Sequence, residues 1–338
     1  MPAETLVGFT DHARKQVFRG AWATPLLKFI KERLNKKLVY LGLPGVAALD
    51  IKAWIEYLRV VIAFQCLDDE KDYEEAENEF KLLQTYLNEC ATSGKLEDYG
   101  LYQGYLEQVI MTGVDDTLAP FNQNEYITVY NLDFCNTLTS PYDVVYPNGS
   151  TQKCTKLDVV DKLLSIQNAL PTSVSSNKFL MYVTVNANFL ERDFDSIKDK
   201  EYKNYKKHIG NLKQASQNAR LIKAYAFYHL NSIFKKHNFQ AEFLPTMYYM
   251  GSGRHRVKGT NELINTWMLT FTILGSRLTT ADSQPYQQDV VQYLNCKFLF
   301  ASDTTIACYQ EKKFAEEDFT ADPNILIQES YTIKNLWK

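Results

Sequence analysis

The sequence predicts an α/β fold with a doubly wound, mostly parallel sheet, and three observations support this prediction. Short runs that are apolar on both faces, "KLVYLGLPG" (37–45) and "RVVIAFQ" (59–65), are typical of parallel strands covered by helices on each side. Helical patterns alternate with these runs along the chain. Two later runs, "FQAEFLPTMYYMG" (239–251) and "INTWMLTFTILGS" (264–276), predict an antiparallel hairpin at the C-terminal edge of the sheet.

The first elements indicate a helix followed by a strand–helix–strand unit. Thr24 is expected to cap a helix that has Pro25 at its first position and stops at Asn35. The segment "ALDIKAWIEYL" (48–58) then supplies the helix between the first two strands. The next segment, "DDEKDYEEAENEFKLLQTYLNEC" (68–90), has apolar residues at steps of three and four, which predicts an amphipathic helix with an acidic, solvated face.

The later elements continue the alternation of strands and helices. They are a strand at 126–134, a turn-rich stretch at 135–150, a helix around 157–164 that stops before Pro171, a strand at 178–189 and a helix at 212–237. The turn-rich stretch is too long for a simple connector, and long loops at the carboxyl end of a sheet are often functional.

Three parts of the chain follow from this order of elements. Residues 1–35 form an N-terminal helical segment, and residues 36–277 form the main domain with the Rossmann-like sheet. Residues 278–338 show no clear periodicity and are expected to be a strand-rich or irregular extension packed on that domain. The best strand candidate within the extension is "QYLNCKFLFAS" (292–302).

Charge and composition exclude several classes of protein. The 37 Lys and Arg against 40 Asp and Glu give a net charge of -3, which excludes the overall basic excess of a nonspecific nucleic-acid binder. No apolar stretch approaches the roughly 20 residues of a membrane helix, and the N-terminus lacks the apolar core of a secretory signal, so we expect a cytoplasmic protein without a membrane span. The six cysteines form no C-x-x-C pair, which favours reduced thiols and no metal site.

Candidate site residues lie where the predicted strands end. Gly42 and Gly45 follow the first strand, where glycine lets the backbone approach a ligand. Gln65 and Asp68 follow the second strand, where a side chain can bind ribose hydroxyls. The later strand ends in "NLDFCN", which presents Asn131, Asp133 and Asn136. The alternatives are that the glycines only turn the chain and that Asp133 forms an Asx turn or a helix cap.

A basic segment, "GSGRHRVKG" (251–259), is the clearest local positive charge. Arginine matches phosphate oxygens well, and the flanking glycines give Arg254 and Arg256 reach, so this segment could contact nucleic acid. It could equally be a solvated hairpin tip, since no aromatic residues are interleaved with the basic ones.

Taken together, these stretches resemble the class I S-adenosylmethionine-dependent methyltransferase superfamily. The resemblance covers residues 36 to about 275 and lies in "VYLGLPG" (39–45), "VIAFQ" (61–65), "VYNLDF" (129–134) and the closing hairpin. A fainter likeness, to the three-Cys-motif partner group of methyltransferase-like proteins, lies in the N-terminal helix that leads into the glycine turn and in "LDFCNTLTSP" (132–141).

The resemblance implies S-adenosylmethionine as cofactor, with Gly42 and Gly45 beside its methionine part and Gln65 or Asp68 at its ribose. Asp133 would be the catalytic residue near the transferred methyl, with Asn136, Arg254 and Arg256 on the substrate side and nucleic acid as the favoured acceptor. The sequence departs from the family in its few loop glycines, the missing carboxylate at residue 65 and the absence of a "DPPY" signature. The alternative is therefore a catalytically inactive methyltransferase-like subunit or sensor that acts with a protein partner in a larger complex.

Overall fold

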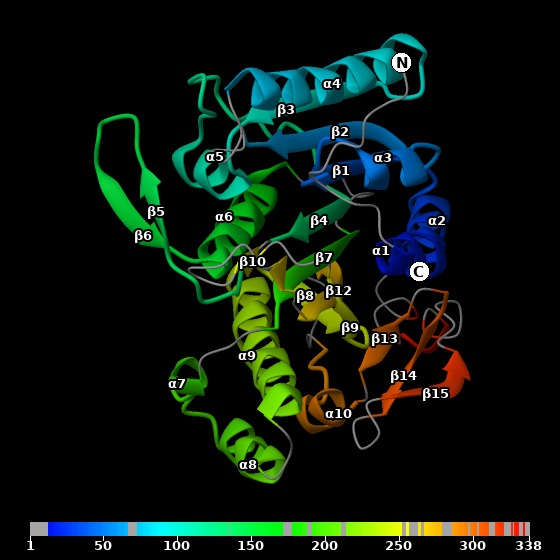
Figure 1. Ribbon diagram of the computed structural model, residues 1–338, viewed down its shortest axis with the longest axis vertical. Coiled ribbons are helices and arrows are strands. Elements are labelled where there is room, and N and C mark those ends of the chain that lie inside the picture. Colours follow the sequence, from blue (N-terminus) through cyan, green and yellow to red (C-terminus); the bar gives the residue numbers. More distant parts are fainter. Residues whose placement is uncertain are drawn as a thin grey trace.

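The computed structural model has one large sheet at its centre, with helices on both faces (Figure 1). It describes residues 13–66, 73–134, 136–171, 178–187, 191–210, 214–251, 255–256, 263–264, 267–278, 286–296, 298–302, 304–310, 315–320, 326, 328–330 and 334. The predicted α/β class is confirmed.

The helices precede, connect and cover the strands. They are α1 (Ala13–Val17), the π-helix η1 (Phe18–Ala23), α2 (Thr24–Leu34), α3 (Leu49–Trp54), α4 (Tyr73–Thr92), α5 (Leu106–Thr112), α6 (Lys156–Ala169), α7 (Glu191–Phe194), α8 (Lys200–Ile209), α9 (Gln214–Lys236) and α10 (Val290–Asn295). Helices α5, α6 and α9 lie on one side of the sheet, and α1, α2 and α3 lie on the other (Figure 1).

The strands fall into one large sheet and two short hairpins. They are β1 (Leu38–Gly42), β2 (Leu58–Gln65), β3 (Asp98–Gln103), β4 (Val129–Asp133), β5 (Tyr142–Val145), β6 (Thr151–Cys154), β7 (Lys178–Asn186), β8 (Phe239–Phe243), β9 (Met247–Met250), β10 (His255–Arg256), β11 (Leu263–Ile264), β12 (Trp267–Arg277), β13 (Leu299–Ala301), β14 (Ile306–Gln310) and β15 (Ala315–Thr320).

The large sheet is doubly wound, as predicted. Among the described residues its order is β15-β14-β13-β9-β12-β7-β4-β1-β2-β3, and β8 also pairs with β12. Strands β3, β2, β1, β4 and β7 are mutually parallel. The chain runs outward from β1 to β3 and then returns to β4 on the other side of β1. The order of strands therefore reverses between β1 and β4, which is the position where Rossmann-like sheets bind ligands.

Strand β12 is antiparallel to its neighbours, so the predicted hairpin is confirmed. It pairs with β7 on one side and with β8 and β9 on the other. The sheet continues beyond this hairpin, because β9 pairs in parallel with β13, and β14 and β15 follow. These last strands cover an edge that would otherwise expose unpaired backbone groups. The predicted strand at 292–302 is only partly correct, since its first half lies in helix α10.

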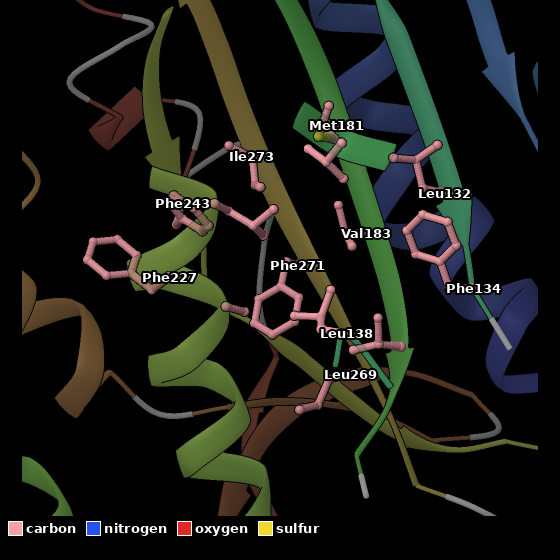
Figure 2. Close-up of a cluster of buried hydrophobic side chains, with 14 of the residues drawn as sticks. Leu132, Phe134, Leu138, Met181, Val183, Phe227, Phe243, Leu269, Phe271 and Ile273 are labelled. Atoms are coloured by element: carbon pink, nitrogen blue, oxygen red, sulfur yellow. The ribbon is translucent and has the colours of Figure 1, made fainter. Parts of the chain in front are cut away.

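The larger of two cores lies between the sheet and helices α5, α6 and α9. Figure 2 shows part of this core, where Leu132 of β4, Phe134 just after it, Met181 and Val183 of β7 and three residues of β12 point toward the same layer. Phe227 of α9 packs edge-on against Phe243 of β8, with ring centroids 4.8 Å apart. The intervening residues of the same strands fill the core on the opposite face, which explains why the strands are apolar throughout.

The smaller core lies under η1, α2, α3 and α4. Its large side chains are Trp22 of η1, Trp54 of α3, Tyr40 of β1 and Tyr182 of β7, all fully buried. Trp54 stacks on Tyr182, with ring centroids 6.3 Å apart. Each of these four aromatic side chains carries one polar atom, so this core contains buried hydrogen-bonding groups.

The N-terminal region differs from the prediction. Helix α2 contains Pro25 in its first turn and ends at Asn35 in the left-handed conformation, as predicted. Thr24 does not cap it, because α1 and η1 run directly into α2 and the Thr24 hydroxyl donates to the carbonyl of Arg19 at 2.7 Å. Gly20 is exposed within η1 and disfavours a helix there, but the helical segment from α1 to α2 continues through it.

The stretch 135–150, predicted to be a loop, contains part of a hairpin. Strands β5 and β6 pair there in antiparallel fashion and are joined by a turn in which Gly149 has a φ of 80°. The Asn148 carboxamide accepts a hydrogen bond from the Ser150 amide at 3.0 Å. The sequence "NG" is a strong hairpin signal. Strands β5 and β6 are short and mostly exposed, so they contain no apolar run that would predict them.

An ion-pair cluster joins α6 to the end of α9, and it predicts a pH-dependent stability. Lys236 Nζ and His237 Nε2 lie 2.7 and 2.9 Å from the Asp161 carboxylate. Burial alone would raise the pKa of Asp161, but hydrogen bonds from Lys236 and His237 lower it below its ordinary value of 3.8. The carboxylate therefore adds stability above that value and loses its contribution as the pH falls through the folded-state pKa.

We expect Asp161→Asn to lower the free energy of unfolding by about 0.5–1 kcal/mol near pH 7 and by less than that near pH 3. Urea denaturation of both proteins at the two pH values measures this difference. An equal loss at both values would show that the substitution acts through packing instead of charge.

Candidate functional site

The carboxyl ends of β1, β4 and β7 and the amino-terminal half of the antiparallel β12 carry a layer of polar side chains on one face of the sheet. Gly42 is in register with Asn131, Asn131 with Tyr182, and Tyr182 with Thr272, so these four residues share a face. One step further along, Asp133 is in register with Thr184, and Thr184 with Thr270. We call this set the polar layer: Asn131, Asp133, Tyr182, Thr184, Thr270 and Thr272.

The N-terminal helices α1 and η1 cover the polar layer. Lys15 Nζ lies 2.5 Å from Asp133 Oδ2, and Trp22 Nε1 donates to Thr272 Oγ1 at 3.0 Å. The Phe18 ring packs edge-on against Tyr182, with centroids 5.3 Å apart. Arg14 donates to the carbonyl of Met250 at the end of β9, at 3.1 Å. These contacts join a segment at the start of the chain to strands more than 100 residues away.

A second charged pair lies between β1 and β4. Asp50, in the first turn of α3, forms an ion pair with Arg19 of η1. Asn131 Nδ2 donates to Asp50 Oδ2 at 2.7 Å and to the Tyr40 hydroxyl at 3.3 Å. Arg19 is 7% exposed and Asn131 is 3% exposed, so this network is buried. Sequence reasoning assigned no role to Lys15, Arg19 or Asp50. The i,i+4 spacing of Lys15 and Arg19, which places both cations on one helix face, was the available signal.

Burial and charge act in opposite directions on these groups. Burial alone would lower the pKa of Lys15, but the Asp133 carboxylate, with Tyr249 and Asp50, outweighs it and raises that pKa. Burial raises the pKa of Asp50 although Arg19 and Lys15 oppose this. Burial also raises the pKa of Tyr249 to about 12. Lys15 is therefore held as a cation against Asp133.

The two predicted loop glycines serve the backbone in different ways. A Cβ atom on Gly42 would lie 2.5 Å from the Asn131 carbonyl oxygen and 2.6 Å from the Tyr40 hydroxyl. Gly42 is therefore required for the packing of β1 against β4 and Tyr40. Gly45 has a φ of 64°, which favours glycine, and its carbonyl accepts a hydrogen bond from the Ala48 amide at 3.0 Å. A larger residue at position 42 would therefore disturb the packing of β1, whether or not a ligand binds there.

The remaining predicted residues lie at the same edge or outside the described residues. Gln65 ends β2, is 9% exposed, and donates from Nε2 to the Cys66 carbonyl at 3.0 Å. Asn136 follows β4, has an exposed side chain and accepts from the Asn186 amide through its carbonyl at 3.3 Å. Arg256 is described through its backbone in β10. Asp68 and Arg254 lie outside the described residues.

The basic segment 251–259 leaves the sheet at the edge that carries Asp133. Strand β9 is antiparallel to β12, which is antiparallel to β7, so β9 and β7 point the same way. Because β7 is parallel to β4, Met250 at the end of β9 and Asp133 at the end of β4 lie at one edge. The structure therefore brings Gly42, Asp133 and the start of the basic segment to the same edge.

No helix among the described residues has both the length and the apolar character needed to cross a bilayer. No group of three or more His, Cys, Asp or Glu side chains in the described part of the chain is placed to hold a metal ion.

Comparison with solved structures finds similar chains. They include TYW2 from P. horikoshii in complex with MeSAdo (10% identity, TM-score 0.36, covering 80% of this chain and 65% of that one). They also include magnesium protoporphyrin IX methyltransferase from Synechocystis with bound SAH (13%, 0.32, 78% and 89%). A third is an rRNA methylase from Streptococcus thermophilus (13%, 0.32, 75% and 94%).

None of the curated proteins matches the chain. A sequence profile of the PP_RS20740-like family matches residues 11–255, which is well over half of the chain and extends from α1 to the start of β10. The chain therefore belongs to the PP_RS20740-like family.

Proposed function

We propose that this protein is an S-adenosylmethionine-dependent methyltransferase. The observation that carries this proposal is the position of Asp133, Asn131 and Asp50 at the carboxyl ends of β1 and β4, where the strand order reverses. Open α/β sheets bind their ligands in the crevice at this position. An otherwise apolar strand such as β4 does not need a carboxylate at its end, so Asp133 there favours a functional role.

The side chains at this edge fit the chemistry of the cofactor. Bound there, S-adenosylmethionine would supply a methyl group on a positively charged sulfur. The Asp50 and Asp133 carboxylates would attract its cationic groups, and Gln65 offers an amide for ribose hydroxyls. The orphaned Tyr182 hydroxyl, which is buried and has no hydrogen-bond partner among the described residues, adds one more polar group under η1. Asp68, at the second strand, belongs to the same proposal.

Asp133 would orient or deprotonate the methyl acceptor. Its carboxylate ends β4 at the crevice, and a group held in line with the cofactor gains mostly from proximity and orientation. Asn136 follows within three residues and would contact the substrate. We propose nucleic acid as the acceptor, because the basic segment with Arg254 and Arg256 starts at this same edge and arginine suits phosphate.

Calorimetric titration with S-adenosylmethionine tests the proposal. We expect micromolar binding to the wild-type protein and a loss of at least about tenfold in Gln65→Ala. Gln103→Ala is the matched control, because Gln103 ends the neighbouring strand β3 in register with Gln65 but one strand further from the β1–β4 crevice. Equal binding by all three proteins would remove Gln65 from the site, and no binding to folded protein would overturn the cofactor assignment.

A second candidate function, an inactive methyltransferase-like subunit or sensor within a protein complex, is favoured by one observation. The crevice groups are satisfied by the chain itself: Asp133 by Lys15, Asp50 by Arg19, and Gln65 by its neighbouring backbone. Folded protein that does not bind S-adenosylmethionine but copurifies with a stoichiometric protein partner would support this second function.

A further inference from the structure

Helix α1 is attached to the rest of the molecule in a different way from the helices that follow it. None of the residues in α1 is buried, whereas η1 buries Arg19, Trp22 and Ala23, and α2 buries Leu26, Leu27 and Ile30. Lys15 of α1 bonds to Asp133 and Arg14 bonds to the Met250 carbonyl, while Val17, the last residue of α1, is half-buried against the smaller core. Polar contacts therefore make up much of the attachment of α1, whereas buried side chains hold the segment behind it.

The junction between the two parts suits a hinge. Residues 18–23 form a π-helix, a form that is less stable than an α-helix and is common at functional sites. Gly20 lies within it, is exposed, and has no atom within 4 Å of the place of a Cβ. Glycine weakens a helix at such a position. Because Arg19, Trp22 and Ala23 are buried, a bend that keeps the core intact lies at the start of η1, before Arg19.

The surface beneath α1 is suited to a cation. Lys15 Nζ faces Asp133, and the Tyr249 hydroxyl and the Asp50 carboxylate contribute to its electrostatic environment. The Tyr182 hydroxyl, fully buried under η1, has no hydrogen-bond partner among the described residues. The Lys15 and Asp133 side chains remain 28% and 26% exposed, so water and salt reach the ion pair and weaken it.

We propose that α1 is an internal lid whose Lys15 ammonium occupies the place of a ligand's cationic group at Asp133. When α1 swings away about η1, Asp133 is released and the polar layer opens at the edge where β4 ends. This inference rests on the proposed function in one respect, that the incoming cation belongs to S-adenosylmethionine. The lid itself is a property of α1 and can be tested without any ligand.

Hydrogen exchange tests the lid. Lys15→Met removes the cation that holds α1, so the backbone amides of residues 17–23 should exchange at least about tenfold faster, while those of residues 26–34 keep their rate. Raising the salt concentration from about 50 to 500 mM should speed the same amides in the wild type, since screening weakens the ion pair. Lys28→Met is the control, because Lys28 is an exposed lysine on α2. Asp133→Asn breaks the same contact from the other side and should act like Lys15→Met.

Titration with S-adenosylmethionine tests the exchange of one cation for another. Lys15→Met should bind it about tenfold more tightly than the wild type, and Lys28→Met should bind it equally well. Weaker binding by Lys15→Met would make Lys15 part of the ligand site and overturn the lid. Unchanged exchange rates at residues 17–23 in both Lys15→Met and Asp133→Asn would also overturn it. Faster exchange without binding by any variant would uphold the lid and reject the cofactor assignment.

Discussion

Replacing Asp50 with alanine is expected to lower the free energy of unfolding by about 3–5 kcal/mol, because the substitution removes a carboxylate that pairs with the buried Arg19 guanidinium. The Asn131 carboxamide also loses the acceptor that lies 2.7 Å away. Urea denaturation of the wild type and the variant measures the loss. The exposed Asp143 on β5 provides the control, since Asp143→Ala should change stability by less than about 0.5 kcal/mol.

A double substitution separates a lost ion pair from a damaged fold. Arg19→Met together with Asp50→Leu removes both charges and leaves apolar side chains of similar size, so it should recover more than half of the stability that Asp50→Ala loses. A loss below about 1 kcal/mol in Asp50→Ala would contradict the buried network and would indicate that water compensates Arg19.

The second large effect is expected at Glu107, which forms an ion pair with Lys156 on the opposite face of the sheet. The two side chains are 11% and 8% exposed, and the Lys156 ammonium lies 5.3 and 4.8 Å from the ring centres of Phe134 and Tyr142. Glu107→Leu removes the carboxylate and leaves the Lys156 cation buried without it. We expect this substitution to lower the free energy of unfolding by about 3–5 kcal/mol. The rings offset only part of this loss, since a cation–π contact contributes roughly 0.5–2 kcal/mol.

A double-mutant cycle with Lys156→Met checks the second prediction. The pair Glu107→Leu and Lys156→Met should be more stable than Glu107→Leu alone, because no unpaired charge is left. Thermal unfolding of the four proteins gives the coupling energy. Lys153→Met, on the exposed strand β6, is the control for the loss of a lysine in this region. Additive losses in the cycle would show that Glu107 and Lys156 stabilise the fold independently.

The sequence predicts the centre of the fold well and its margins poorly. Strands β1, β2, β4 and β7 were predicted because they are buried on both faces and therefore consist of unbroken apolar runs. Strand β3 was missed because its residues are exposed or half-buried and read "DYGLYQ", which has no apolar run. Among the described residues β3 is an edge strand, and backbone pairing with its one neighbour supplies part of its stability. The pattern of side chains in the sequence does not reveal that pairing.

The candidate site likewise contains residues that the sequence predicts and residues that it does not. Asp133 could be predicted because a carboxylate ends an apolar strand, and the structure places it at the edge shared with Gly42. The partners of Asp133 and Asp50 could not be predicted, because Lys15 and Arg19 lie on a helix whose polar residues look like an ordinary surface. Only the tertiary fold brings that helix onto β4 and α3, across 118 and 31 residues of sequence.

The insertion of β12 between β7 and β8 has a consequence for the order of assembly during synthesis. Residues 267–277 join the two halves of the sheet, so β7 and β8 have open edges until these residues have left the ribosome. Contacts across such distances form slowly, and open edges pair readily with other chains. A nascent chain that stalls before residue 267 would therefore be a natural target for chaperones, and slow translation of residues 267–277 would favour aggregation over folding.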